Sequence, residues 1–239
     1  MLIRLEKMRL DTNTQTNIDI GIVSNNQKKH MNMIKKIISY LRSRILLYRY
    51  PNCHSSVHIG MDVRVYEKKN LVMEEETNID RGAIIMNTRA KVIFKKWSGA
   101  AVGLLAVSGN HMSVVGRNLK QVTDELKNQL DVNRELDKDI VVEEDCWIGS
   151  RVTLLSGVHI GRGGVVGSGS VVRKSTPPYA IISGNPAKIV GFRFTPSEVI
   201  EHEKALYEEN MRLPLDVLEK NYNKYFISRI KEIKTFSKL

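Results

Sequence analysis

Aliphatic residues recur at intervals of six through residues 142–176, and small or β-branched residues recur four places after them. The aliphatic first places are Val142, Ile148, Leu154, Ile160, Val166 and Val172, and the fifth places are Cys146, Val152, Val158, Gly164, Ser170 and Thr176. Side chains repeat about every 3.6 residues in an α-helix and every 2 in a strand, so a period of six fits neither. It predicts a coil of short strands in which three hexads form one triangular turn and the aliphatic residue points inward. Gly149, Gly161 and Gly167 follow three of these residues, where we expect glycine to supply corner dihedral angles.

A less regular version of the pattern precedes this segment and predicts earlier coils of the same solenoid. Its first places are Ile59, Val65, Leu71, Ile79, Ile85, Phe94, Ala100 and Ala106, with slips of phase after Leu71 and near Lys91. Between Gly116 and Asp139 the repeat gives way to a polar, charged segment. We expect residues 117–139 to form a protruding loop, because insertions into a solenoid lie at its surface and often carry function.

The N-terminal part of the chain differs from the solenoid in composition. Residues 11–30 are polar and lack periodicity, and we expect residues 1–30 to form a flexible leader. Residues 31–50 place apolar side chains at helical spacing with basic residues largely elsewhere, and Pro51 ends the pattern. We expect a basic amphipathic helix that packs on the end of a core, while contact with an anionic membrane surface is the open alternative.

The C-terminal part predicts helices. The solenoid domain is expected over residues 52–194, followed by helices over 195–239. Thr195-Pro196-Ser197-Glu198 is a capping-box sequence with proline at the first helical position. After Pro214 an apolar stripe indicates a second helix that caps the solenoid or a subunit interface. The stripe comprises Leu218, Tyr222, Tyr225, Phe226, Arg229 and Ile233.

Composition narrows the class of protein. The chain has 239 residues, 42% of them hydrophobic and 26% charged, which suits one globular domain with appendages. We expect a cytoplasmic protein, because no apolar run reaches the roughly 18 residues of a membrane span and no signal peptide is evident. The net charge is +11, but residues 1–50 hold 10 basic and 3 acidic residues and so account for +7. The solenoid is therefore close to neutral and lacks the basic, aromatic patches of nucleic-acid binding.

Four blocks of the solenoid resemble a known family. They are Asp145-Cys-Trp-Ile-Gly-Ser150, Ser156-Gly-Val-His-Ile-Gly161, Gly167-Ser-Gly-Ser-Val-Val-Arg-Lys174 and Ser183-Gly-Asn-Pro-Ala-Lys188. Over residues 79–193 the chain is similar to hexapeptide-repeat acyltransferases, especially maltose, galactoside and capsular-polysaccharide O-acetyltransferases. The resemblance implies a left-handed parallel β-helix and acetyl-CoA as co-substrate. It also implies a homotrimer with active sites between adjacent subunits.

The resemblance assigns the catalytic groups. The family's catalytic histidine falls on His111, whose neutral imidazole can take a proton from an acceptor hydroxyl. Asn87 matches an asparagine beside the acceptor, and a corner asparagine in left-handed conformation is an equal alternative. The backbone N–H of Ser150, directly after Gly149, is implied as the donor to the oxyanion.

The same resemblance implies a coenzyme groove. Trp147 matches a tryptophan that walls the acyl and pantetheine channel, although packing between coils or subunits would also explain it. Ser168 matches a position whose backbone contacts the pantetheine arm. Cations near the end of the solenoid suit the phosphates of coenzyme A. These cations are Arg173, Lys174 and Lys188. Gly191 stands where some relatives have another arginine, and Arg193 is the candidate to make that phosphate contact instead.

Metal and thiol chemistry are not expected. His54 and His58 have a spacing that suits two metal ligands on a helix, but they follow Pro51, where the coils begin. The chain also lacks the close histidine pair of the related γ-class carbonic anhydrases, so we expect no metal. We expect both cysteines to be reduced, with Cys146 a buried structural thiol.

The sequence therefore predicts an acetyl-CoA-dependent O-acetyltransferase acting on a sugar or polysaccharide precursor. A xenobiotic (antibiotic) O-acetyltransferase is the first alternative, and a non-catalytic β-solenoid scaffold is the second. The basic helix 31–50 would suit a peripheral position at the inner face of a membrane, where lipid-linked glycans are made.

Overall fold

The computed structural model describes residues 48–236, and in them short strands build three sheets. The first sheet contains β1 (His58–Ile59), β4 (Asn78–Ile79), β7 (Gly99–Ala100), β10 (Trp147–Ile148), β13 (Val165–Val166), β15 (Ala180–Gly184) and β16 (Ala187–Phe192). The second contains β2 (Arg64–Val65), β5 (Ile84–Met86), β8 (Leu105–Val107), β11 (Thr153–Leu155) and β14 (Val171–Val172). The third contains β3 (Leu71–Met73), β6 (Val92–Phe94), β9 (Ile140–Val142) and β12 (His159–Ile160).

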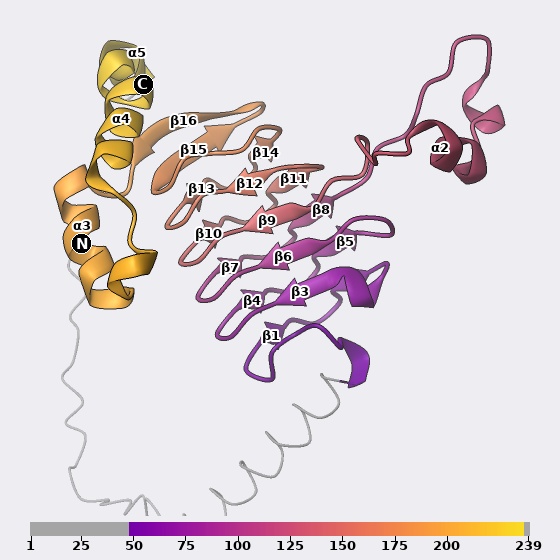
Figure 1. Ribbon diagram of the computed structural model, residues 1–239, viewed down its shortest axis with the longest axis horizontal. Helices are drawn as coiled ribbons and strands as arrows, with labels where there is room; N and C mark the ends of the chain where they lie inside the picture. Colours follow the sequence, from indigo (N-terminus) through magenta and orange to yellow (C-terminus); the bar gives the residue numbers. More distant parts are fainter. Residues whose placement is uncertain (1–47, 237–239) are drawn as a thin grey trace, which may run out of the picture. The chain divides into compact units, whose positions relative to one another are not determined.

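The chain visits the three sheets in turn, so that each strand pairs in parallel with the strand one coil later (Figure 1). Ile79 on β4 pairs with Ala100 on β7, and Ala100 pairs with Ile148 on β10. Only β15 and β16 among the described strands pair antiparallel. This is a parallel β-helix of triangular coils, as the six-residue period predicts.

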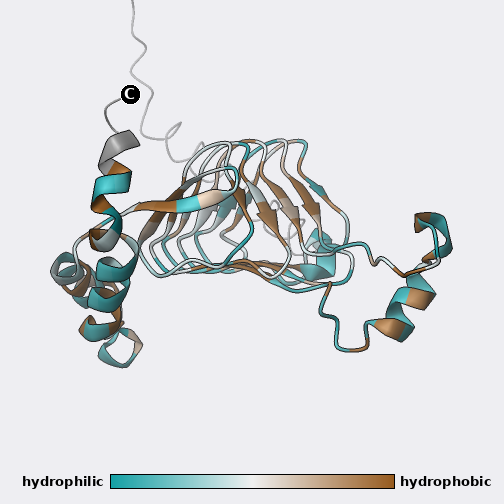
Figure 2. Ribbon diagram, turned by 90° about the horizontal axis from the view of Figure 1, so that it is seen from above, coloured by the Kyte–Doolittle hydropathy of each residue, from teal (hydrophilic) through white to brown (hydrophobic). Residues whose placement is uncertain are grey.

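The aliphatic first places form the core of the coils. From Ile79 to Val172 every first place is at most 1% exposed, and the buried fifth places include Cys146, Val152 and Val158. In the preceding coil the prediction of Leu71 as a first place was wrong, because Met73, which is 1% exposed, pairs with Phe94, whereas Leu71 pairs with Val92. The slip of phase therefore lies before Met73, at the corner between the second and third sheets, and not after Leu71. Figure 2 shows the hydrophobic strands stacked along the coils. The inward orientation predicted from the hexads is therefore confirmed.

The corners correct the role predicted for the glycines. Positive φ angles occur at the fourth place of consecutive hexads, as at Asp145 (56°) and Arg151 (54°). Gly149, at a second place, is not among the residues with positive φ. A Cβ added to Gly149 would lie 2.7 Å from the backbone nitrogen of Ser168 and from the backbone oxygen of Val166. Glycine at the second place therefore permits close approach of the next coil, and the prediction that it serves corner dihedrals was wrong.

An insertion leaves the coils between β8 and β9. It contains the 3-10 helix η2 (Leu119–Gln121) and helix α2 (Asp124–Leu130), and it projects away from the coils (Figure 1). A second 3-10 helix, η1 (Lys68–Asn70), lies between β2 and β3. The insertion thus starts at the corner between the second and third sheets.

The C-terminal segment contains α3 (Pro196–Leu206), η3 (Glu209–Met211), α4 (Leu215–Tyr225), η4 (Ile227–Arg229) and α5 (Ile230–Phe236). The capping box of Thr195 and Glu198 is confirmed. The apolar stripe predicted as one helix after Pro214 is interrupted at Phe226, where φ is −123° and ψ is −64°. The α4 face packs on a small second core through Leu218.

The predicted leader 1–30 and nearly all of the predicted helix 31–50 lie outside the described residues. Between residues 48 and 236, no helix is long and apolar enough to cross a membrane.

Candidate active site

His111 lies where the insertion leaves the coils, at the corner between the second and third sheets. It follows β8, and its side chain is exposed. Within residues 48–236 its imidazole has no hydrogen-bond partner. A free ring nitrogen at an exposed corner is available to a hydroxyl substrate.

Ser150 lies at a different corner, between the first and second sheets. Its backbone N–H donates to the hydroxyl of Ser168 at 3.2 Å, and Ser168 occupies the same corner one coil later. The Ser168 side chain is exposed and can rotate away. The N–H of Ser150 becomes available to an oxyanion only after that rotation.

The second sheet separates these two groups within one chain. In the pairing of β8 with β11, Leu105 lies opposite Thr153 and Val107 lies opposite Leu155. Ser150 precedes β11, whereas His111 follows β8, so they lie at opposite edges of the sheet. The five residue steps from Ser150 to Leu155 span on the order of 15 Å at about 3.3 Å per residue. One copy of the chain therefore does not bring His111 and Ser150 together.

The residues predicted to bind the coenzyme divide between the same two corners. Trp147, whose side chain is 49% exposed, and Lys188, which pairs with Ser183 at the end of β15, lie on the Ser150 side. Arg173 and Lys174 are exposed and follow β14, two coils after His111 at its corner. Two coil spacings amount to about 10 Å.

Arg193 is engaged elsewhere. Its guanidinium donates to the Asp145 carboxylate at 2.7 Å and to the Asp145 carbonyl at 3.2 Å. His202 of α3 contacts the same carboxylate at 3.2 Å. This cluster lies at the corner between the third and first sheets, away from both edges described above.

Asn87 lies one coil before His111 at the same corner, but its amide is occupied. The side chain is 0% exposed; its Oδ1 accepts from the Glu67 N–H at 3.0 Å and its Nδ2 donates to the Glu67 carbonyl at 2.9 Å. Its φ is not positive, so the left-handed alternative does not describe it either. In this conformation Asn87 joins two coils.

Sequence reasoning missed the buried charges beside His111. Lys127 and Asp137 are each 7% exposed, and Lys127 Nζ lies 2.7 Å from Asp137 Oδ1. Arg89 NH1 lies 3.4 Å from the other oxygen of Asp137. The polar pattern of residues 117–139 gave no signal that one of its lysines is buried.

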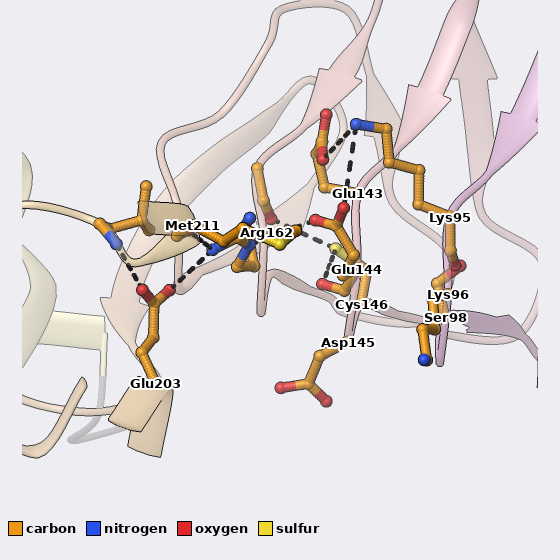
Figure 3. A network of polar contacts seen from close by, with 12 residues as sticks. Lys95, Lys96, Ser98, Glu143, Glu144, Asp145, Cys146, Arg162, Glu203 and Met211 are labelled. Atoms are coloured by element: carbon orange, nitrogen blue, oxygen red, sulfur yellow. Dashed lines mark hydrogen bonds and ion pairs between the residues drawn. The ribbon is translucent and has the colours of Figure 1, made fainter. Parts of the chain in front are cut away.

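A second polar network joins the C-terminal helices to the coils (Figure 3). Glu203 of α3 is 0% exposed and accepts from Arg162 at 3.4 Å, while Arg162 also contacts Glu144 at 3.2 Å. Burial alone would raise the pKa of Glu144, but its backbone hydrogen bond and the Arg162 charge lower that pKa overall. Beside this network, Glu143 and His159 line an open pocket and contact each other at 2.6 Å. The network holds α3 in place and does not reach His111 or Ser150.

The two cysteines are free and buried. Burial raises the pKa of the Cys53 thiol to about 11 and that of Cys146 to about 12. Neither thiol is suited to carry an acyl group near neutral pH, because the thiolate is the nucleophile. In the described part of the chain, no group of three or more potential His, Cys, Asp or Glu ligands is placed to hold a metal ion.

Similarity to known proteins is concentrated in the repeats. Residues 139–174 match the family model described as bacterial transferase hexapeptide (six repeats). A chloramphenicol acetyltransferase of Klebsiella aerogenes is 49% identical over 59 residues, which is 25% of this chain and 28% of that protein. The match therefore spans less than a third of the relative's length.

Two solved structures share the fold. A hexapeptide-repeat-containing acetyltransferase from Vibrio cholerae matches with a TM-score of 0.50 and 22% identity, over 63% of this chain and 78% of that one. A maltose O-acetyltransferase from Clostridium difficile 630 matches with a TM-score of 0.50 and 21% identity, over 70% of this chain and 87% of that one. The left-handed parallel β-helix of hexapeptide repeats is therefore confirmed, as is the resemblance to hexapeptide-repeat acetyltransferases.

Proposed function

We propose that the protein is an acetyl-CoA-dependent O-acetyltransferase that uses His111 as general base. The observation that carries the proposal is the exposed imidazole of His111, which has no hydrogen-bond partner among residues 48–236, on a β-helix whose repeats match those of bacterial transferases. The similar proteins from Klebsiella aerogenes, Vibrio cholerae and Clostridium difficile are acetyltransferases, which supports the same reaction class.

The reaction is a direct transfer. His111 takes the proton of the acceptor hydroxyl as that oxygen attacks the acetyl carbonyl. The Ser150 N–H donates to the oxyanion that forms, once Ser168 has rotated away. Collapse breaks the carbon–sulfur bond, and the departing thiolate of coenzyme A takes the proton from His111. The raised pKa values of both cysteines favour this route over a covalent acyl-enzyme.

The site requires more than one copy of the chain. Because His111 and Ser150 lie at opposite edges of the second sheet, one subunit supplies the base and its neighbour supplies the oxyanion donor. A homotrimer, in which each edge meets the other edge of the next copy, completes three such sites. Sedimentation is expected to give a trimer, and a monomer at micromolar concentration would contradict this arrangement.

Coenzyme A would extend between the two edges. Trp147 and the Ser168 backbone lie on the oxyanion side and suit the pantetheine arm. Lys188 on that side, and Arg173 and Lys174 on the His111 side, are exposed cations available to the phosphates. Asn87 remains a candidate to orient the acceptor only if its two bonds to Glu67 open.

The acceptor is proposed to be a hydroxyl of a sugar or polysaccharide precursor. The local similarity to a chloramphenicol acetyltransferase supports an antibiotic hydroxyl as the second candidate. Calorimetry with acetyl-CoA, followed by thiol release with a panel of sugars and antibiotics, distinguishes them. If the protein binds acetyl-CoA and releases thiol with only the sugars or only the antibiotics, that result identifies the class of acceptor. If it does not bind acetyl-CoA, the enzymatic proposal fails and the non-catalytic scaffold is the remaining hypothesis.

The proposed cellular position is cytoplasmic, with peripheral contact at the inner face of a membrane as the alternative to packing of residues 31–50 on the end of a core. The support is the basic amphipathic pattern of residues 31–50, which would bind anionic lipid. Flotation with anionic liposomes tests it: protein that stays unbound would remove the membrane contact without affecting the proposed reaction.

A further inference from the structure

The insertion is fastened to the coils by buried charges directly beside His111. We propose that Lys127, paired with Asp137, which Arg89 holds in turn, is a positioning residue that sets the place of the His111 imidazole. This inference rests on the proposed function for its kinetic consequences. Its structural basis, the contacts of Lys127, is independent of that function.

Lys127 reaches from α2 back to the start of the insertion. Its Nζ donates to the backbone carbonyl of Asn110 at 2.6 Å and to Asp137 Oδ1 at 2.7 Å. The side chains of Lys127 and Asp137 are 8% and 3% exposed, so both charges are almost fully withdrawn from water. A buried ammonium is tolerated only when it is paired and hydrogen-bonded, and this lysine meets both conditions.

Asp137 is held from the other side by the coils. Arg89, which precedes β6, places NH1 3.4 Å from Asp137 Oδ2 and NH2 3.3 Å from the Asp124 carbonyl. Gly109 and Asp137 also form an antiparallel β-bridge. The two ends of the insertion are therefore joined to each other and to an earlier coil.

The connection to His111 passes through a single peptide bond. The carbonyl that Lys127 holds belongs to Asn110, and that peptide group also contains the N–H of His111. Because a peptide group is planar, fixing its carbonyl oxygen fixes the direction in which the His111 backbone begins. The Asn110 N–H is held in turn by the Leu136 carbonyl at 3.1 Å.

General-base catalysis is sensitive to this placement. A displacement of about 1 Å can reduce turnover by about 100-fold, because the base must lie within hydrogen-bonding distance of the reacting hydroxyl. His111 has no hydrogen bond of its own within residues 48–236 to keep its ring in place. Its backbone anchor is therefore the element that the structure provides for positioning.

The test compares Lys127→Met with Lys120→Met. Methionine matches the Lys127 side chain as far as Cε and lacks the ammonium, while Asp137 keeps Arg89 as a partner. Lys120 is an exposed lysine on η2 of the same insertion and serves as the matched control. We expect Lys127→Met to lower kcat by about 10- to 100-fold with KM for acetyl-CoA changed less than twofold, and Lys120→Met to change neither.

A double variant separates positioning from general damage. If Lys127 acts through His111, adding Lys127→Met to His111→Ala causes no further loss of kcat, because the two changes remove one function. Independent, multiplicative losses would overturn the proposal. An unchanged kcat in the single variant would also overturn it.

A spectroscopic measurement that does not depend on catalysis tests the positioning role of Lys127 separately from the proposed function. In ¹³C-histidine-labelled protein, the His111 imidazole signal is assigned by its loss in His111→Ala, among six histidines. We expect Lys127→Met to shift or broaden that signal and Lys120→Met to leave it unchanged. If the wild type releases no thiol but the signal responds in this way, the proposed function fails and the positioning stands; an unmoved signal overturns the positioning.

Discussion

Gly149→Ala is expected to destabilise the β-helix by forcing neighbouring coils apart. The new Cβ would lie 2.7 Å from both the Val166 oxygen and the Ser168 nitrogen, whereas ordinary contact begins at 3.4 Å. Both obstacles are backbone atoms of the next coil and cannot be relieved by a rotamer change. The coils would therefore have to separate locally by up to about 0.7 Å, the difference between these distances.

Two hydrogen bonds cross the same gap. The Gly149 N–H donates to the Val166 carbonyl at 2.8 Å, and the Trp147 N–H donates to the Gly164 carbonyl at 2.9 Å. Stretching both beyond about 3.4 Å removes them as effective bonds. At about 1 kcal/mol each, the loss is about 2 kcal/mol, which corresponds to a Tm lower by roughly 4–8 °C in a domain of this size.

Gly191→Ala is the matched control. Gly191 also lies in a strand, β16, and a Cβ there meets only Ile181 Cδ1, at 4.0 Å. In thermal unfolding followed by circular dichroism, the free energy of unfolding of Gly191→Ala should lie within about 0.5 kcal/mol of the wild-type value. Equal Tm values for the two variants would refute the explanation of the second-place glycines.

Three further predictions concern thiols, acid and the oxyanion donor. At pH 8 the native thiols of Cys146 and Cys53 should react with a disulfide reagent far more slowly than in denaturant, because their pKa values of about 12 and 11 leave little thiolate; rapid reaction of one native thiol would contradict this. Because the pKa of Glu144 is lowered in the folded chain, its contribution to stability is complete above about pH 4.5 and is lost as the pH falls further. When the pH is lowered from 5 to 3, the Tm of Glu144→Gln should therefore decrease less than the Tm of the wild type. Equal decreases in the two proteins would contradict the stabilising role of the Glu144 carboxylate. Ser168→Ala frees the Ser150 N–H, so kcat should be unchanged or up to about threefold higher; a loss above about tenfold would show that the hydroxyl itself donates.

The hexad pattern predicted the coils because burial in this fold is strictly periodic. Even its slips have a structural meaning. Between Ile85 and Phe94 three extra residues lie at the corner between the second and third sheets, the same corner from which the later insertion leaves. Extra residues at a corner leave strand pairing intact, which explains why the core residues on either side remain in register.

The arrangement of the candidate site was harder to predict from the sequence than the fold. The resemblance indicated His111, and the structure places it at an exposed corner. The separation of His111 from Ser150 depends on which sheet each hexad joins, and the Ser150–Ser168 bond depends on contact between coils. The burial of Lys127 arises from tertiary folding of an aperiodic segment, for which local sequence carries no signal.

Thiol release by the wild type and by His111→Ala, at saturating acetyl-CoA with an acceptor that turns over, tests the central claim most directly. Calorimetry on both proteins first establishes that each binds acetyl-CoA. A general base contributes about 10²- to 10⁴-fold, so we expect kcat to fall by that factor while coenzyme affinity is retained. A His111→Ala protein that binds the coenzyme and turns over at the wild-type rate would contradict the account.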